Sequence, residues 1–147
     1  MGKYDGLKLE NQICFLFYVA SKELIRCISP KLGEMGLTYT GYLVMMVLWE
    51  HKQLKVKEVG AHLYLDSGTL TPLLKKLEIR GLIKRKRSKE DERSVFISLT
   101  QAGIELREQA LAVPEILRES LCMNLPEMNE ATKMMHQLVK DNFSGRT

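Results

Sequence analysis

The chain has 147 residues and a formal net charge of +4, and it is 45% hydrophobic and 27% charged. This balance excludes a disordered or low-complexity chain and predicts one domain, or a compact domain with appended helices. No apolar run approaches the ~18 residues of a membrane helix and the N-terminus has no signal-peptide core, so we expect a cytoplasmic protein. Three widely spaced cysteines argue against a disulfide framework and against a zinc site.

The N-terminal segment predicts one long helix from residue 7 to about residue 35, because apolar residues recur there at helical spacing. A kink or break is expected near Pro30, which lacks a backbone N–H and crowds the preceding turn. A second helix over residues 41–51 follows a cap at Thr38 or Thr40. Its dense apolar residues predict that it is central to the core.

Residues 55–63 predict a short third helix, and residues 65–68 a turn into a fourth helix over residues 68–80. This arrangement is a helix-turn-helix whose last member is the recognition helix. Gly81 stands where a C-terminal glycine stop belongs. Pro72, one turn into the recognition helix, predicts an irregular or bent first turn.

Residues 82–87 and 94–99 alternate as two antiparallel strands around a polar tip at residues 88–93, which predicts the wing of a winged helix. Residues 65–100 hold nine Lys or Arg and five Asp or Glu, a net +4 that equals the charge of the whole chain. A helix followed by a basic ribbon is typical of a DNA reader, because a major groove admits the helix while the ribbon tip reaches the adjacent backbone or minor groove.

The expected DNA contacts are short hydroxyl side chains and cations on these two elements. From the recognition helix they are Ser67, Thr69, Thr71, Lys75 and Lys76, and from the wing Arg85, Arg87, Lys89 and Arg93, with about half of the wing cations facing DNA. Asp91 is expected to hold the Arg93 guanidinium for insertion into a narrow minor groove. The alternative is that Ser67 and Thr69 only cap the helix and that the lysines are solvated.

Thr100 is expected to cap a helix over residues 101–121, bent at Pro114, and a last helix covers about residues 127–143. The apolar stripes of these helices and of the first one need a partner, for which a second copy of the chain is the simplest choice. We therefore predict a mainly α homodimer with a small β-ribbon, in which residues 1–36 and 101–147 dimerise and residues 37–100 form the DNA-binding lobe. Two recognition helices about 34 Å apart would demand a near-palindromic operator.

Cys14 lies between Ile13 and Phe15 on the first helix, and such a cysteine is usually a packing residue. Reactivity would require a thiolate stabilised by hydroxyl donors or by a helix end. Tyr18 and Tyr39 are candidate donors, and the sequence leaves open whether either lies within reach. The three histidines are scattered, and no metal, cofactor or Gly-rich phosphate site is expected.

Four strings carry a resemblance to a known family: LENQICFLFY around Cys14, LTYTGYLVMMVLWEH, LYLDSGTLTPLLKKLE and KRKRSKEDERSVFISLT. Over nearly its full length the chain resembles the MarR family of winged-helix regulators, and within it the organic-hydroperoxide-sensing OhrR branch. The resemblance implies that Cys14 is oxidised by peroxide to a sulfenic acid and that Tyr39 hydrogen-bonds it. It also implies a dimeric repressor, not an enzyme, that releases DNA when Cys14 is oxidised by organic hydroperoxide or a related oxidant.

The sequence departs from this pattern at Ile28, where the family has a second tyrosine, and Cys27 lies beside it. Cys122 lies near the position of a resolving cysteine in two-cysteine members, which implies an intersubunit disulfide with Cys14. Alternatively, Cys122 is a packing residue and the sulfenic acid reacts with a small thiol. Two other functions stay open: a MarR-type repressor released by a small aromatic ligand with Cys14 inert, and a thiol peroxidase that uses Cys14 and Cys122.

Overall fold

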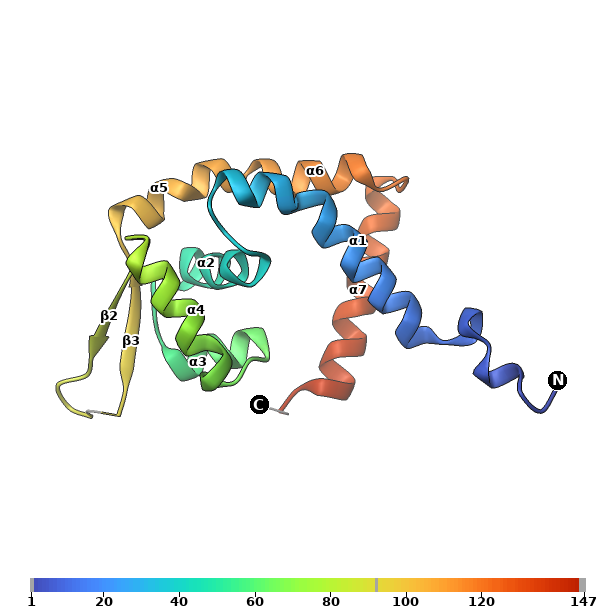
Figure 1. Cartoon of the computed structure of the whole chain (residues 1–147), viewed down its shortest axis with the longest axis horizontal. Helices are drawn as coiled ribbons and strands as arrows, with labels where there is room; N and C mark the ends of the chain where they lie inside the picture. The colour runs from blue at the N-terminus through green and yellow to red at the C-terminus, as the bar shows by residue number, and fades with distance from the viewer. Residues whose placement is uncertain (1, 92, 146–147) are drawn as a thin grey trace.

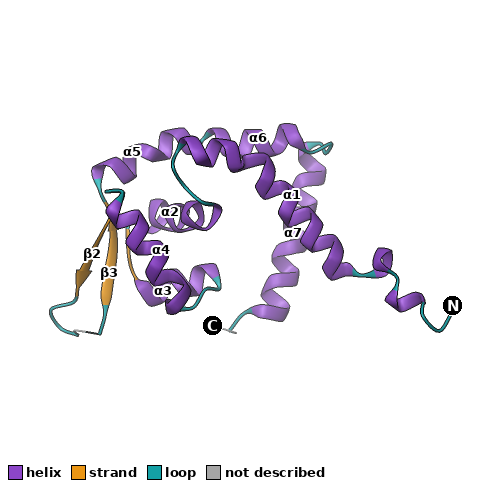
Figure 2. Cartoon of the chain, in the orientation of Figure 1, coloured by secondary structure: helices purple, strands orange, loops and turns teal. Residues whose placement is uncertain are grey.

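The computed structural model describes residues 2–91 and 93–145, so Met1, Glu92 of the predicted wing tip, Arg146 and Thr147 lie outside the described residues. The described chain is mostly helical with one small sheet (Figure 2). Helices α1, α5 and α6 run along one side, and α2 to α4 with the sheet lie beneath them (Figure 1). None of the described helices is long and apolar enough to cross a membrane.

The first helix begins later than the sequence predicts. Two short 3₁₀ turns, Asp5–Leu7 and Leu9–Asn11, precede α1, which spans Ile13–Glu34. The predicted start at residue 7 is therefore wrong, and Cys14 lies in the first turn of the helix instead of in its second. Pro30 lies inside α1 without ending it, because proline removes only one backbone donor and the buried residues Ile28 and Leu32 hold the flanking turns in place.

The helix-turn-helix consists of α2 (Tyr39–His51), α3 (Val56–Leu63) and α4 (Ser67–Ile79). Thr38 caps α2, since its hydroxyl oxygen accepts a hydrogen bond from the backbone N–H of Gly41 at 3.1 Å. The central position of α2 is confirmed by Val44, Met45 and Leu48, which have no exposed surface.

The wing is part of a three-stranded antiparallel sheet with the order β1-β3-β2. The two predicted strands are β2 (Ile83–Arg87) and β3 (Val95–Leu99), and the third is β1 (Gln53–Lys55), which the sequence analysis missed. A strand of three residues shows too little alternation to be detected, and its partner β3 lies about forty residues later in the chain. Gly81 adopts φ +72° and ends α4 as predicted.

The C-terminal part forms three helices where two were expected: α5 (Gln101–Ala110), α6 (Ala112–Ser120) and α7 (Leu125–Phe143). The break lies at Leu111, ahead of Pro114, because the proline ring opposes the carbonyl of the residue four positions earlier, Ala110. Thr100 caps α5 as predicted, accepting from the N–H of Gly103 at 3.1 Å.

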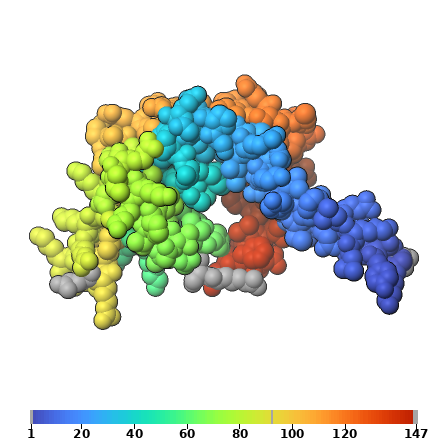
Figure 3. Space-filling view, viewed as in Figure 1, coloured from blue at the N-terminus to red at the C-terminus, as the bar shows by residue number. Residues whose placement is uncertain are grey.

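The two ends of the chain contribute little to the core. All residues of α7 are described and none of them is buried, and the N-terminal arm projects away from the body (Figure 3). Apolar side chains stay exposed on both segments, notably Leu7, Ile13, Leu16 and Met134, which are 78%, 66%, 55% and 65% exposed.

Candidate nucleic-acid interface and cysteine site

Helix α4 is held by its N-cap and by a close approach to α3. The Asp66 carboxylate accepts the backbone N–H of Thr69 and the hydroxyl of Thr69, both at 2.9 Å. These hydrogen bonds lower the pKa of Asp66, so the cap is an anion at neutral pH. Gly60 of α3 is required at the turn, because a Cβ there would lie 2.5 Å from the carbonyl oxygen of Leu65.

One face of α4 is buried and the other is exposed. The buried residues are Leu70, Leu74 and Leu77. All five predicted contact residues lie on the exposed side: Ser67, Thr69, Thr71, Lys75 and Lys76. Two of the hydroxyls already donate locally, Thr69 to Asp66 and Thr71 to the carbonyl of Ser67 at 2.7 Å. These two hydroxyls can therefore only accept a hydrogen bond from DNA, unless they give up their local bonds and donate to DNA instead.

The wing is tied to α4 by Arg85, which was expected to contact DNA. Its Nε donates to the Glu78 Oε2 at 2.7 Å and its Nη2 lies 2.6 Å from the same oxygen. Two nitrogens of the Arg85 guanidinium thus contact one carboxylate oxygen, and this interaction lowers the pKa of Glu78. The Arg85 guanidinium is thereby turned toward α4, and Glu78, which the sequence analysis did not single out, is the residue that orients it.

The wing tip is organised by Ser88 and Asp91. The Ser88 hydroxyl accepts the backbone N–H groups of Glu90 and Asp91 at 3.2 and 3.3 Å. Asp91 accepts the backbone N–H of Arg93 at 3.0 Å and the hydroxyl of Ser94 at 2.7 Å. The expected link between Asp91 and Arg93 thus runs to the Arg93 backbone, and Arg93 is exposed together with Arg87 and Lys89.

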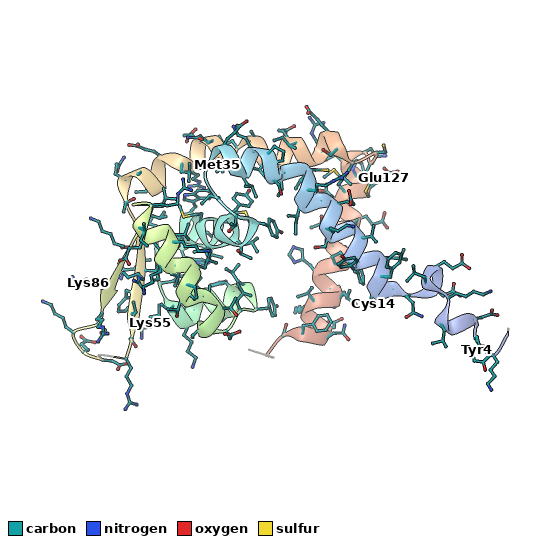
Figure 4. All side chains as sticks on the ribbon, viewed as in Figure 1. Tyr4, Cys14, Met35, Lys55, Lys86 and Glu127 are labelled. Carbon is teal, nitrogen blue, oxygen red and sulfur yellow. The ribbon has the colours of Figure 1, made fainter. Side chains whose placement is uncertain are left out.

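Cys14 lies at the opposite end of the molecule from the wing (Figure 4). It is exposed and occupies the second position of α1, where no side chain caps the helix. A helix start favours a nearby negative charge, as a thiolate carries. Ile13 precedes Cys14 and Leu16 follows it two positions later. Their side chains are 66% and 55% exposed, so the surface around Cys14 is apolar.

The structure does not bring Tyr39 to Cys14 within one chain. Tyr39 lines an apolar groove of about 310 Å³ with Ile28, Tyr42, Val113 and other residues of α1, α2 and α6. Leu24, the groove residue of α1 closest to Cys14 in sequence, lies ten residues after it, which is ~15 Å along the helix axis. A tyrosine side chain cannot span that distance, so any bond between Tyr39 and Cys14 must join two subunits.

The other two cysteines, Cys27 on α1 and Cys122 in the turn between α6 and α7, are also exposed, and all three are free thiols. Across residues 2–91 and 93–145 no cluster of three or more His, Cys, Asp or Glu side chains is arranged to hold a metal ion. The two redox candidates besides Cys14 therefore stand as single thiols on the surface of the chain.

The chain matches a family of transcriptional regulators, SarA/Rot, over residues 26–110. It is also 55% identical over 112 residues to the organic hydroperoxide resistance transcriptional regulator of Bacillus subtilis, which covers 76% of each chain. The chain belongs to the MarR family, in its organic hydroperoxide resistance branch.

Solved structures of the MarR family share the fold. Reduced AbfR bound to DNA, from Staphylococcus epidermidis, is 36% identical, covers 95% of this chain and 96% of its own, and superposes with a TM-score of 0.80. The disulfide form of AbfR, at the same identity and covering 95% of this chain and 92% of its own, superposes with a TM-score of 0.64. The conformation of this MarR chain is thus more similar to the reduced, DNA-bound AbfR than to its disulfide form.

Proposed function

We propose that this chain is a dimeric, DNA-binding transcriptional repressor that senses organic hydroperoxide or a related oxidant through Cys14 and releases its operator on oxidation. The observation that carries the proposal is the exposed Cys14 in the first turn of α1, in a chain 55% identical to an organic hydroperoxide resistance regulator. Cys14 lies outside the core of its own chain, at the start of the helix.

The DNA contacts are made by exposed residues of α4 and of the wing tip. From the first turn of α4, Ser67 reaches base edges or phosphates. Thr69 and Thr71 do so when their local hydrogen bonds exchange, or accept from a base amino group as they stand. Lys75 and Lys76 reach the DNA backbone. From the wing we keep Arg87, Lys89 and Arg93. We no longer propose Arg85 as a DNA contact, because its guanidinium is bound to the Glu78 carboxylate.

The dimer is formed by residues 1–36 and 101–147, and residues 37–100 form the DNA-binding lobe. Support comes from α7, which has no buried residue, and from the exposed apolar side chains of the N-terminal arm and of α1. Such a surface on two long segments is typical of an interface and not of a monomer surface. A twofold dimer presents its two α4 helices to a near-palindromic operator.

The sensing step is a two-electron oxidation. The Cys14 thiolate attacks the terminal oxygen of ROOH, the O–O bond breaks, and after proton transfer the products are Cys14 sulfenic acid and the alcohol ROH. Tyr39 of the partner subunit donates a hydrogen bond at this centre, since Tyr39 of the same chain is too far away. Cys122 of the partner subunit then attacks the sulfenic sulfur, forming a disulfide and releasing water.

Oxidation releases DNA because it alters the dimer geometry that spaces the two recognition helices. A tenfold change in affinity needs only ~1.4 kcal/mol, which a small displacement of two helices from successive grooves easily exceeds. This single chain superposes on reduced AbfR bound to DNA with a TM-score of 0.80 and on disulfide AbfR with 0.64, which supports a change in chain shape between those two forms.

The test is a gel shift on the DNA upstream of its own gene, with the protein reduced and after one equivalent of cumene hydroperoxide. The reduced protein is expected to shift the duplex, and the oxidised protein to release it until a thiol reductant is added. Equal binding by both forms would contradict the proposal. Intact-mass spectrometry of the same samples should show one added oxygen or a loss of two hydrogens per disulfide.

A second function is favoured by the groove beside Tyr39. Its walls are apolar, including Leu24, Ile28, Met46 and Leu117, and the Tyr39 hydroxyl is available as a polar group, which suits a small aromatic effector. In that case a small aromatic acid would release DNA from Cys14→Ser protein, and hydroperoxide would leave the unmodified protein on its operator.

A further inference from the structure

The outward face of the sheet carries a regular array of cations and hydrogen-bond donors. The strand register places two rows across β1, β3 and β2 on this face, away from the buried Ile83 and Ile97. The rows are Gln53, Ser98 and Lys84, and Lys55, Phe96 and Lys86. These six positions hold three ammonium groups, an amide, a hydroxyl and one aromatic ring, with no carboxylate among them. We call this array the outer sheet face.

Local contacts hold part of the outer sheet face in place. The Lys55 Nζ lies 5.6 Å from the centroid of the Phe96 ring, so a cation covers the only apolar member of the array. A hollow of about 380 Å³ borders Phe96, Lys86 and the wing tip. Figure 4 shows Lys55 and Lys86 at the wing, at the end of the molecule opposite Cys14.

Among the described residues, the carboxylates beside the outer sheet face are Glu58, whose Oε2 accepts the backbone N–H of Lys55 at 2.6 Å, and two of the wing tip. Asp91 is bound to Ser94 and to the backbone of Arg93, and its pKa is lowered first by these bonds and then by the charge of Lys55. Glu90 lies at the rim of the hollow. Arg87 and Lys89 border the same hollow, so among the described residues five cations face these three carboxylates and the surface suits a polyanion.

We propose that the outer sheet face binds phosphates of the DNA duplex that flanks the operator, beyond the groove reached by the wing tip. Lys84 and Lys86 are two residues apart on β2, which places their Cα atoms ~7 Å apart, and Lys55 and Lys86 lie two strands apart, ~10 Å. This spacing lets the flexible ammonium groups follow neighbouring phosphates of one strand. Gln53 and Ser98 add neutral donors of the kind that contact phosphate oxygens.

The inference rests on the proposed function, because it takes α4 and the wing tip to lie on DNA. Once they do, the duplex that leaves the tip is the polyanion at the highest local concentration, which favours it over an acidic protein surface. Neutralising phosphates on one side draws the flanking duplex toward the protein, so the contact bends DNA outside the operator. Neither the contact nor the bend requires a specific base sequence.

The test compares two duplexes: a short one ending at the wing contacts, and a long one extended by about one helical turn on each side. Wild-type reduced protein is expected to bind the long duplex more tightly, and each phosphate contacted steepens the slope of log K against log salt by about 0.9. In Lys84→Ala/Lys86→Ala, the additional affinity for the long duplex and its steeper salt slope should both decrease, while binding to the short duplex stays unchanged. Arg107→Ala, on the exposed side of α5, is the control. It should keep the additional affinity for the long duplex and the steeper salt slope.

Three results would overturn the inference: equal wild-type affinity for the two duplexes, an unchanged long-duplex slope in the double variant, or an equal decrease in affinity on both duplexes. The last would place the two lysines within the operator contacts. Failure of the wild-type protein to bind even the short duplex would instead contradict the proposed function. Changing the flanking base sequence at constant length should leave the additional affinity for the long duplex unchanged, because the lysines contact phosphates and not bases.

Discussion

The Nη2 of Arg85 lies 2.6 Å from the Oε2 of Glu78, and this ion pair joins the first strand of the wing to the recognition helix. The Glu78 carboxylate also accepts the backbone N–H of Arg85 at 3.3 Å. One carboxylate therefore fixes both the guanidinium and the strand at the point where the wing leaves α4. The orientation of the wing relative to α4 depends on this link.

We expect Glu78→Gln to lower the melting temperature at neutral pH and to make DNA binding weaker. The pKa of Glu78 is lowered in the folded protein, so its stabilising effect is present above the unfolded pKa of about 4.5 and is lost as the pH falls through the lower, folded value. Melting temperatures measured between pH 3 and pH 7 should differ most between wild type and variant at pH 7, and the difference should shrink as the pH falls below about 4.5. A constant difference at all pH values would show that the charge of Glu78 is not involved.

Arg93→Ala should weaken binding to the operator and reduce the salt slope by about one per subunit, since an exposed cation at the wing tip is expected to neutralise a phosphate or enter the minor groove. Fluorescence anisotropy at several salt concentrations measures both quantities. Arg107→Ala removes the same charge from α5 and should leave the slope unchanged. If the two variants behave alike, Arg93 is not a contact residue.

Tyr39→Phe should slow the oxidation of Cys14 while DNA binding of the reduced protein stays intact. Removing one hydrogen bond at the reacting centre costs ~0.5–1.5 kcal/mol, or a rate lower by roughly twofold to thirteenfold. Stopped-flow thiol oxidation with cumene hydroperoxide measures it. Tyr18→Phe is the matched control, because Tyr18 lies one turn after Cys14 and is 62% exposed in the chain. A slower rate in the control and not in Tyr39→Phe would assign the donor to Tyr18.

Cys122→Ser should abolish the crosslinked dimer that oxidation of the wild type is expected to give on a non-reducing gel. Without a resolving thiol, the sulfenic acid should persist and be trapped by dimedone. Cys27→Ser provides the control, because this thiol is exposed as well but lies on α1 and not in the turn between α6 and α7. Absence of the crosslink in Cys27→Ser alone would make Cys27 the resolving cysteine.

Local signals predicted much of this fold. Thr38, Thr100 and Gly81 begin or end helices as expected, because capping depends on residues close in sequence. Features that depend on pairing between different elements were missed, namely strand β1 and the role of Glu78 in orienting Arg85. The late start of α1 was missed because an apolar periodicity does not show whether the chain before Ile13 forms an α-helix or 3₁₀ turns.

The site residues could be proposed from sequence and resemblance, but not their distribution over the molecule. The sequence could not show that Tyr39 shares a groove with Leu24, about 15 Å along α1 from Cys14. Nor could it separate Arg85 from the other wing cations, since alternation along a strand does not reveal a partner on a neighbouring helix. Both results depend on tertiary packing.

The most direct measurement is a DNA-binding titration of wild type and Cys14→Ser against increasing cumene hydroperoxide, with the three thiols followed by mass spectrometry. Both reduced proteins should bind the operator with similar affinity, because Cys14 lies far from α4 and the wing. The wild type should dissociate as Cys14 gains oxygen or forms a disulfide, and Cys14→Ser should stay bound. Release of DNA by Cys14→Ser at the same peroxide concentration would contradict the account.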